Sequence, residues 1–528
     1  MMGFMSGITV LFFFILLFFA GYILQRYLIG AQSLLEILVF SYAFGLSFII
    51  VVCPVLDHVW EISLGSVTCA VLPLSILLVI KKSTPLTLPG KWELICIGCI
   101  LLYGFLLRAY TLTDPLPQGQ DAWRHLSFIS SIYETGHLPQ VVPWALPPLP
   151  VTIVMYPPGA HCMGALLSHA MGSVSFRFLT SVFILTATGS ALSSYVVFRD
   201  LFGSKTALIS SILIVSFLSH MVMSSEITAQ SLSIFIFPLI PYFFYKTKYA
   251  ACILLTGSVF LIHHFSAFSV TMSLFCIMCG FMLKTKKFTY LLAFLLICGG
   301  SLLLSSPWWS HISLLLADTG LRSTASVPVT QPLSLDPYTS MVSPLFILMS
   351  MIGFFIFLKK GEKKYVLMIA WGLILFLATQ PAFPIKFHEH RFLAFFIFPC
   401  SVMVASGLLS IRHRIHPALF IVLLLLLCVR IPPQFWPSTG EVNLSANEWM
   451  GESTLDAVVY VYGPHYTFVY ALSHRKIYEI ADFDDPFSSQ YTPTYFYDDA
   501  AWVPHDISQF GTYDKLYSCS TVSICRID

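Results

Sequence analysis

The sequence predicts a polytopic helical membrane protein, and three observations carry this prediction. The chain has 528 residues, of which 57% are hydrophobic and only 10% are charged, whereas soluble domains carry about 25% charged residues. Apolar windows long enough to cross a bilayer recur along the sequence. The remaining polar residues gather in a few loops and in the last part of the chain. The net charge of +2 gives no basic surface for a nucleic-acid partner.

Apolar windows of about 16–22 residues predict roughly fourteen membrane-spanning helices. They lie near 8–29, 34–56, 62–80, 92–110, 177–198, 206–223, 228–245, 250–265, 267–283, 288–306, 341–358, 365–378, 392–411 and 416–431. We divide the chain into an N-terminal three-helix membrane extension (1–91), a transmembrane domain (92–431) with a long loop at 111–158, and a C-terminal domain (432–528).

Basic residues predict how the helices are oriented, because they stay cytoplasmic in short loops. The clusters that share one side are Lys81, Lys82, Arg199, Lys205, Lys246, Lys248, Lys284, Lys286, Lys287, Lys359, Lys360, Lys363, Lys364, Arg412 and Arg414. The loop 111–158 and the tail 432–528 are therefore expected outside the cytoplasm of the cell membrane. Segment 159–175 is apolar, but a crossing there would invert every later loop. We expect it to form a helix at the outer interface.

The tail has the pattern of a small α/β domain. Ser445–Gly451 favours a short helix, Ala457–Tyr462 a buried strand, and Tyr513–Ile527 a terminal hairpin. Cys519 and Cys525 could form a disulfide if this domain faces an oxidising space, but the sequence leaves their state open.

Asp121 is the most informative polar residue, because ionisable groups at a membrane boundary are costly and so tend to be functional. Asp121–Glu134 contains no proline or glycine and is expected to be helical. Asp121 and His125 are then one turn apart on the same face. The pair fits a general base that activates an acceptor hydroxyl. The alternative is an acid that satisfies free N–H groups at a helix N-terminus.

Further candidates come from distant segments expected on the same side. Glu226 lies in a tight turn between two apolar windows, where it is either part of a site or a helix N-cap. His263 and His264 are adjacent and point to different faces, so at most one is expected to serve the site; their adjacency is poor for chelating a metal. Arg391 could bind a phosphate, or only flank the membrane. No GxSxG, Walker, HExxH or glycine-rich dinucleotide motif is present, which argues against soluble nucleotide chemistry.

Four short motifs, taken together, resemble the GT-C superfamily of membrane glycosyltransferases, in particular its prokaryotic branch. Gly119–His125 resembles the acidic motif of the first outer loop, and Tyr156–His161 the tyrosine-proline-proline-glycine stretch that follows it. Leu201–Lys205 is similar to a cytoplasmic turn, and His390–Leu393 with Pro399 to the late arginine segment. The resemblance covers about residues 92–411. The tail is more weakly similar to the extracytoplasmic domains of oligosaccharyltransferases.

The resemblance implies a GT-C-like bundle and an inverting sugar transfer. A polyprenyl-phosphate or polyprenyl-diphosphate carrier would donate the sugar to a glycan, lipid or protein acceptor on the outer face. Asp121 would be the base and Arg391 the partner of the lipid phosphate. Many members have a second acid where this chain has Ala122, so a divalent cation such as Mg²⁺ or Mn²⁺ is in question; Glu226 could supply a second carboxylate. The remaining residues expected to bind substrate are Trp123, His125, Tyr156, His263, His264 and His390.

Two other function classes fit a chain of this composition. A transporter or lipid flippase would place polar groups along a path through the membrane, usually near the midplane. The charges of this chain cluster on one side instead, which argues against transport. A non-catalytic subunit of a glycan assembly complex would use the acidic tail to recruit a partner. The sequence does not identify the sugar, the carrier, the acceptor or the oligomeric state.

Overall fold

A computed structural model describes most of the membrane bundle and five strands near the C-terminus. The described residues are 2–30, 33–77, 86–112, 120–140, 156–319, 343–380, 389–412 and 416–428, with strands at 458–462, 477–480, 494–499, 513–519 and 522–527. Side chains are described throughout the helices except at residues 2–5, 110, 120, 121, 123, 310–319, 389 and 390, and not in the strands.

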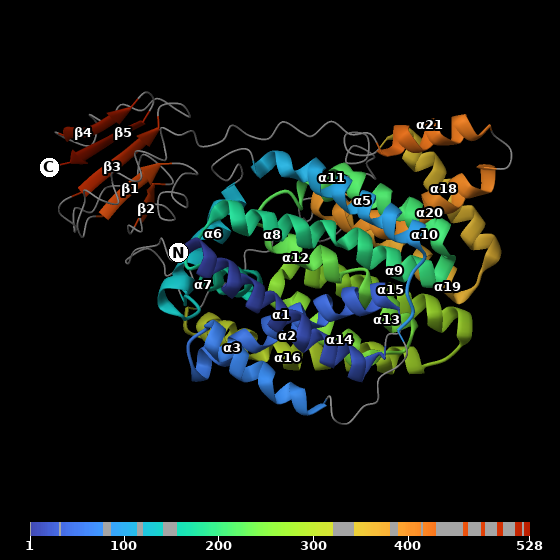
Figure 1. The fold of residues 1–528 in the computed structure, drawn as a ribbon, viewed down its shortest axis with the longest axis horizontal. Coiled ribbons are helices and arrows are strands. Elements are labelled where there is room, and N and C mark those ends of the chain that lie inside the picture. The colour runs from blue at the N-terminus through green and yellow to red at the C-terminus, as the bar shows by residue number, and fades with distance from the viewer. Residues whose placement is uncertain are drawn as a thin grey trace.

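Most helices of the bundle follow the predicted apolar windows, and two, at Gln120–Thr135 and Gly159–Met171, lie between windows (Figure 1). In chain order they are α1 (Met2–Leu28), α2 (Leu34–Val59), α3 (Leu64–Val71), η1 (Leu72–Ser75), α5 (Lys91–Ala109), η2 (Tyr110–Leu112), α6 (Gln120–Thr135), α7 (Gly159–Met171), α8 (Phe176–Thr188), α9 (Ser190–Phe202), α10 (Ser204–Ser216), α11 (Leu218–Val222), α12 (Ala229–Ile236), α13 (Leu239–Tyr245), α14 (Tyr249–Ile262), α15 (His264–Thr285), α16 (Thr289–Thr319), α18 (Pro344–Lys360), α19 (Lys363–Ala378), α20 (Glu389–Ile411) and α21 (Pro417–Cys428).

Seven helices in the described part of the chain are long and apolar enough to cross a membrane. They are Ser6–Leu28, Leu34–Val59, Lys91–Ala109, Phe176–Phe202, His264–Thr285, Thr289–Trp309 and Arg391–Ile411. Several other predicted windows are shorter or broken, as where Phe217 separates α10 from α11 and Pro238 separates α12 from α13. The multi-pass membrane class is confirmed, while the count of about fourteen spans stays a prediction.

The first two helices cross in close contact. A Cβ atom at Gly21 of α1 would lie 1.6 Å from the carbonyl oxygen of Ser41, and one at Gly45 of α2 would lie 2.0 Å from that of Leu17. Only glycine therefore lets the two backbones approach this far, as at other small-residue crossings in membranes. α2 in turn packs against α14 and α16. The predicted division of 1–91 into a separate extension stays untested.

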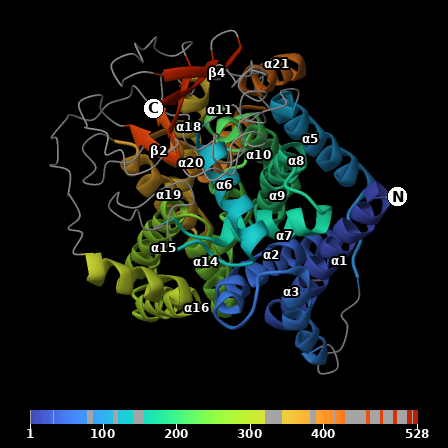
Figure 2. The same cartoon turned by 90° about the vertical axis from the view of Figure 1, so that its left-hand side faces the viewer.

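α7 forms in the segment where a helix that does not cross was predicted. Its 13 residues are too few to span a bilayer, but it is not a surface helix. Almost all of its side chains are buried, because it packs against α1, α2 and α6 (Figure 2). The segment is thus a short helix that does not cross, as expected, and protein covers it; its depth in the membrane stays a prediction.

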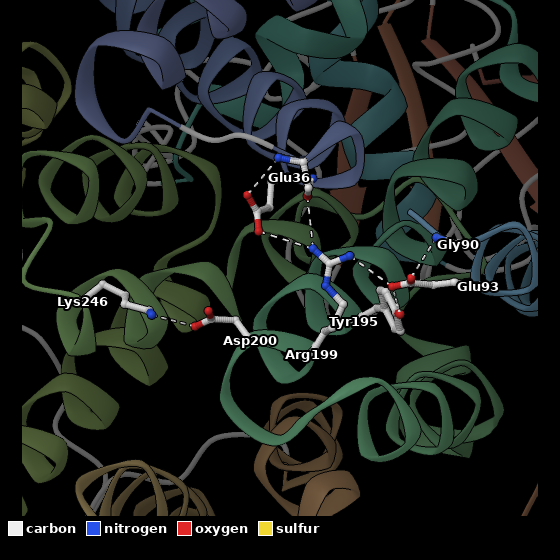
Figure 3. A network of polar contacts seen from close by, with 8 residues as sticks. Glu36, Gly90, Glu93, Tyr195, Arg199, Asp200 and Lys246 are labelled. Carbon is white, nitrogen blue, oxygen red and sulfur yellow. Dashed lines mark hydrogen bonds and ion pairs between the residues drawn. The ribbon is translucent and has the colours of Figure 1, made fainter. Parts of the chain in front are cut away.

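Ion pairs join four helices at one end of the bundle (Figure 3). Arg199 of α9 lies 3.0 Å from the carboxylate of Glu93 on α5 and 3.4 Å from that of Glu36 on α2. Tyr195 donates to the same Glu93 carboxylate. Lys246, after α13, lies 2.8 Å from Asp200. We call the side chains of Glu36, Glu93, Tyr195, Arg199, Asp200 and Lys246 the ion-pair network.

The C-terminal strands form one five-stranded sheet with the order β2-β1-β3-β5-β4. The strands are β1 (Val458–Tyr462), β2 (Ile477–Ile480), β3 (Thr494–Asp499), β4 (Tyr513–Cys519) and β5 (Val522–Ile527). β1 runs parallel to β2 and β3, whereas β5 is antiparallel to β3 and β4. β1 coincides with the predicted strand and β4–β5 with the predicted hairpin. The helix expected at Ser445–Gly451 lies outside the described residues, so the α/β domain stays a prediction.

The register of the hairpin bears on the disulfide that the sequence left open. Cys519 pairs with Val522, whereas Cys525 pairs with Lys515. The two cysteines are thus offset by three positions along β5, or about 10 Å. A disulfide requires Cα atoms within about 7 Å. This register therefore does not permit a Cys519–Cys525 bond.

Candidate functional site

The helix that carries Asp121 forms as the sequence predicts. α6 spans Gln120–Thr135 without interruption, so Asp121 is in its first turn and His125 one turn later. The side chains of Asp121 and Trp123 lie outside the described part, and their roles stay predictions. His125 is buried at 4% exposure, because α6 packs along α7.

His125 forms a hydrogen bond with a histidine from the next helix. Its Nδ1 atom lies 2.8 Å from Nε2 of His161 on α7, and the ring of Phe128 lies against His161 with centroids 4.7 Å apart. One imidazole must donate a proton and the other accept it, so the pair is held together when at least one ring is neutral. Burial, followed by the nearby His125, lowers the pKa of His161 well below its usual value. His161 is therefore neutral near pH 7.

Tyr156, which precedes α7, contacts the rings of histidines from α6, from α7 and from the start of α15. Its ring centroid lies 5.1 Å from that of His125, 5.5 Å from His161 and 5.4 Å from His264. His263 is slightly further, at 6.0 Å. We call His125, Tyr156, His161, His263 and His264 the histidine cluster. The sequence analysis named four of these five residues; His161 was visible only as part of the Tyr156–His161 motif.

The two adjacent histidines have different environments. His263 is buried at 1% exposure and caps α15, since its Nδ1 accepts from the backbone N–H of Ser266. The Ser266 hydroxyl lies 2.7 Å from that of Ser233 on α12, which extends the polar contacts into the bundle. His264 is exposed. Of the two, His264 is the one that an incoming ligand could contact, as expected for neighbours on different faces.

Arg391, at the start of α20, lies beside this cluster. The next residue, Phe392, packs against Phe265 with ring centroids 4.3 Å apart. Gln230 of α12 donates to the Arg391 carbonyl oxygen at 3.2 Å. The fold thus brings Arg391 to the histidines, although they are more than a hundred residues apart in sequence. The side chain of His390 is outside the described part.

Glu226 lies in the turn between α11 and α12, and this turn is held by the end of α5. Glu226 is 8% exposed, so it is not a surface acid. It is also not an N-cap, because Thr228 occupies that position of α12. Thr111 donates to the Ser225 carbonyl oxygen at 2.8 Å. The N-cap alternative of the sequence analysis is therefore wrong, whereas a role of Glu226 in the site stays a prediction.

A fully buried arginine supports the same turn and was missed by the sequence analysis. The Arg108 side chain is 0% exposed. Its guanidinium donates to Ser224 at 2.7 Å and to the Val215 carbonyl oxygen at 3.2 Å, and lies 2.9 Å from Nδ1 of His220. The only sequence signal was an arginine near the end of a predicted span. Arg108 fixes α10, α11 and the Glu226 turn relative to α5.

The described side chains form no preassembled site for a divalent metal ion. No group of three or more His, Cys, Asp or Glu residues with a geometry suited to a metal is present among them. Mg²⁺ prefers oxygen ligands, whereas the histidine cluster offers imidazole nitrogens, two of which face each other in a hydrogen bond. A metal that uses Asp121 stays a prediction, and no chemical step below depends on one.

Comparisons with known proteins give a fold but no close relative. No family model matches the sequence, and no curated protein is significantly similar to it. Among solved structures, an oligosaccharyltransferase from Archaeoglobus fulgidus in the apo form has a TM-score of 0.54 and 13% identity over 74% of this chain. The chain spans 64% of that protein's length. The same enzyme, AglB, solved with an inhibitory peptide and a dolichol-phosphate, gives a TM-score of 0.52 at 13% identity, over 73% of this chain and 64% of AglB.

A second type of membrane protein matches over more of its length. ArnT from Cupriavidus metallidurans, solved with undecaprenyl phosphate, has a TM-score of 0.56 and 9% identity, covering 82% of this chain and 98% of ArnT. Identities this low show the fold alone. The resemblance seen in four short motifs is thereby confirmed for the architecture: the membrane bundle has the fold shared by these GT-C glycosyltransferases.

Proposed function

We propose that this protein is a membrane glycosyltransferase that takes a sugar from a polyprenyl-phosphate or polyprenyl-diphosphate carrier. Two kinds of solved neighbour were bound to undecaprenyl phosphate and to dolichol-phosphate, which supports a carrier of this chemistry. The observation that carries the proposal is that Phe392 packs against Phe265, which sets Arg391 next to the histidine cluster and beside the helix that bears Asp121. A cation next to neutral rings suits the phosphate of such a donor.

The proposed reaction is a single displacement at the anomeric carbon. Asp121 takes the proton of an acceptor hydroxyl, and the acceptor oxygen attacks the sugar from the face opposite to the carrier phosphate. The new glycosidic bond forms as the bond to the phosphate oxygen breaks, so the configuration inverts. Arg391 stabilises the negative charge that grows on the leaving phosphate. The products are the glycosylated acceptor, the free carrier phosphate and a proton held by Asp121.

The residues of the histidine cluster take different roles in this proposal. His264 is exposed and lies beside both Tyr156 and Arg391, so it contacts the donor together with Trp123 and His390. His125 and His263 are buried and engaged in hydrogen bonds. We assign them to positioning Tyr156 and the start of α15. Glu226 stays a candidate second carboxylate.

The proposed orientation follows from the two ends of α2. This helix begins at Leu34, beside the ion-pair network, and ends at Val59. Its 26 residues extend for about 39 Å, enough to cross a bilayer. The network contains Arg199 and Lys246, and basic residues favour the cytoplasm. We propose that the opposite end, with the histidine cluster, and the C-terminal domain face the extracytoplasmic side.

Replacement of the proposed base tests the function directly. In membranes given a radiolabelled polyprenyl-phosphate sugar, Asp121→Asn is expected to lower the transfer rate at least about 100-fold, since a general base contributes about 10²–10⁴. Glu134→Gln is the matched control, because it removes an exposed carboxylate from the same helix. Undiminished transfer by Asp121→Asn would exclude Asp121 as the base. Substrate accumulation in sealed vesicles without a glycan product would favour a transporter, and activity that requires a second polytopic chain would favour a non-catalytic subunit.

A further inference from the structure

A polar cavity that the proposed chemistry does not use lies between α2, α16 and the segment after α6. Its volume is about 280 Å³, and its lining includes Asp57 and His58 from the end of α2, His137 and Gln140, and Trp308 of α16. This volume is close to the lower end of the range for small-molecule pockets, which is about 300 Å³. The cavity is therefore large enough for a single small ring of a ligand.

The walls of this cavity are fixed by hydrogen bonds. Oδ1 of Asp57 accepts from the Leu138 backbone N–H at 3.0 Å and lies 3.1 Å from Nδ1 of His137. Just beside them, the Ile62 N–H donates to the Gly136 carbonyl oxygen at 2.7 Å. These bonds attach the end of α6 to the end of α2. Within the described part of the chain, both hydrogen-bond contacts of Asp57 use Oδ1, so Oδ2 is the oxygen that we expect a ligand hydroxyl to meet.

The chemistry of the lining favours a neutral, hydroxyl-rich ligand. Asp57 can only accept when ionised, Gln140 both donates and accepts, and the two imidazoles can do either. Trp308 closes one side of the cavity but is only 2% exposed, so a ligand would be held mainly by hydrogen bonds to the polar lining. Among the described residues that line the cavity there is no lysine or arginine, and the Asp57 carboxylate repels anions. The carrier phosphate is therefore a poor fit.

The position of the cavity separates it from the proposed reaction centre. It lies at the end of α6, whereas Asp121 lies at its start, and the 16 residues of this helix extend for about 24 Å. A sugar bound here cannot give its proton to Asp121. A narrower pocket beside it shares Leu138 and Trp308 and reaches Tyr156 and His161. The cavity thus adjoins the histidine cluster without being part of it.

We propose that this cavity, lined by Asp57, His58, His137, Gln140 and Trp308, is a remote subsite that binds a neutral sugar of a glycan. The inference rests on the proposed function only for the role of the subsite. That role would be to hold a distal sugar of the acceptor or donor glycan while the other end of the glycan reacts. Binding at the subsite itself requires no transfer.

The test measures binding of neutral tetrasaccharides to the full-length protein in lipid nanodiscs. Saturation-transfer difference NMR with maltotetraose, mannotetraose and chitotetraose is expected to show binding of at least one of them. The double variant His58→Ala/Gln140→Ala alters two exposed side chains and is expected to weaken that binding at least tenfold. Asp57→Asn should weaken it as well, and circular dichroism would verify that this variant folds. His416→Ala, an exposed histidine of another segment, is the matched control and should bind as the wild type does.

The outcomes separate this inference from the proposed function. Absence of binding by all three tetrasaccharides, or equal binding by the double variant, would overturn the subsite. So would displacement of the bound tetrasaccharide by inorganic phosphate. Asp121→Asn should bind the tetrasaccharide like the wild type while transfer is lost. Wild-type protein that binds but never transfers sugar would refute the proposed function and leave the subsite standing.

Discussion

The ion-pair network and the histidine cluster differ in how their polar side chains are stabilised. Both hold polar side chains inside an apolar bundle. In the network, the guanidinium of Arg199 lies between two carboxylates at 3.0 and 3.4 Å, so opposite charges satisfy one another. In the cluster, imidazole rings and Tyr156 pack by their faces and edges, with centroids 5.1–6.0 Å apart, and the nearby charge is Arg391. The first arrangement is complete without a ligand, whereas the second suits an anion.

The difference predicts where mutations act. Loss of a charge from the network leaves its partners facing each other in a half-buried site, so the effect falls on stability. Loss of a charge at the cluster removes a partner for the ligand, so the effect falls on binding. Four variants, in order of decreasing effect, test this separation.

Arg199→Ala is expected to have the largest effect on stability. It leaves the carboxylates of Glu36 and Glu93 without their shared cation, which lowers the free energy of unfolding by about 2–3 kcal/mol, less than in a fully buried pair. Thermal unfolding of purified protein measures this loss. Arg177→Ala, at an exposed arginine of α8, is the control and should change the melting temperature little. Equal melting temperatures of Arg199→Ala and Arg177→Ala would show that the network contributes nothing to stability.

Arg391→Gln is expected to act on donor binding instead. A charge-assisted hydrogen bond to phosphate contributes about 1.5–3 kcal/mol, so the Kd for undecaprenyl phosphate should rise about 10–100-fold. Arg391→Lys should recover part of this loss, because it retains the charge but not the planar fork. Isothermal calorimetry in detergent gives both values. If Arg391→Gln and the wild type bind undecaprenyl phosphate with the same Kd, Arg391 only flanks the membrane.

The His125–His161 pair should make stability fall in acid. The pKa of His161 is lower in the folded protein than in the unfolded chain, so below about pH 6.5 the unfolded state binds the extra proton. The stability that comes from the neutral ring is complete above that pH and is lost as the pH falls toward the folded pKa. Asparagine in the His161→Asn variant cannot titrate. Between pH 7.5 and 5.5 the free energy of unfolding of this variant should therefore fall by about 1 kcal/mol less than that of the wild type. Parallel melting curves across this range would contradict the prediction.

Tyr156→Phe should have the smallest effect of the four. Tyr156 makes ring contacts with the histidines, and phenylalanine retains these ring contacts. We expect transfer within about twofold of wild type and a melting shift equivalent to less than 0.5 kcal/mol. Tyr156→Ala, the matched comparison, removes the ring and should impair both. A large loss with phenylalanine would instead assign the hydroxyl a role in substrate binding.

Some features of the site could be predicted because they are local. The helix at Asp121–Glu134 follows from a stretch without proline or glycine, and α6 spans it. The i and i+4 relation of Asp121 and His125 follows from the same geometry. The different environments of His263 and His264 follow from their adjacency. Each of these depends on the periodicity of one segment and on nothing beyond it.

Other features depend on contacts between segments and could not be predicted. The pairing of His125 with His161 requires α6 to lie along α7, and the buried position of Glu226 requires Arg108 and Thr111 to hold its turn. The burial of α7 by other helices could not be predicted, because the sequence of an apolar 13-residue helix does not show which segments will cover it. The offset between Cys519 and Cys525 depends on strand register, which spacing along the chain does not fix.

The sequence by itself determined the membrane class and the helical segments, because hydrophobicity and helix periodicity act along a single stretch of chain. It also determined which polar residues deserved attention, since charge is rare in an apolar composition. Only the tertiary structure decided which polar residues meet: Tyr156 and His264, Arg199 and Glu93, Asp57 and His137. Such contacts join segments far apart in sequence, and their energies arise only when the packed helices bring the groups together.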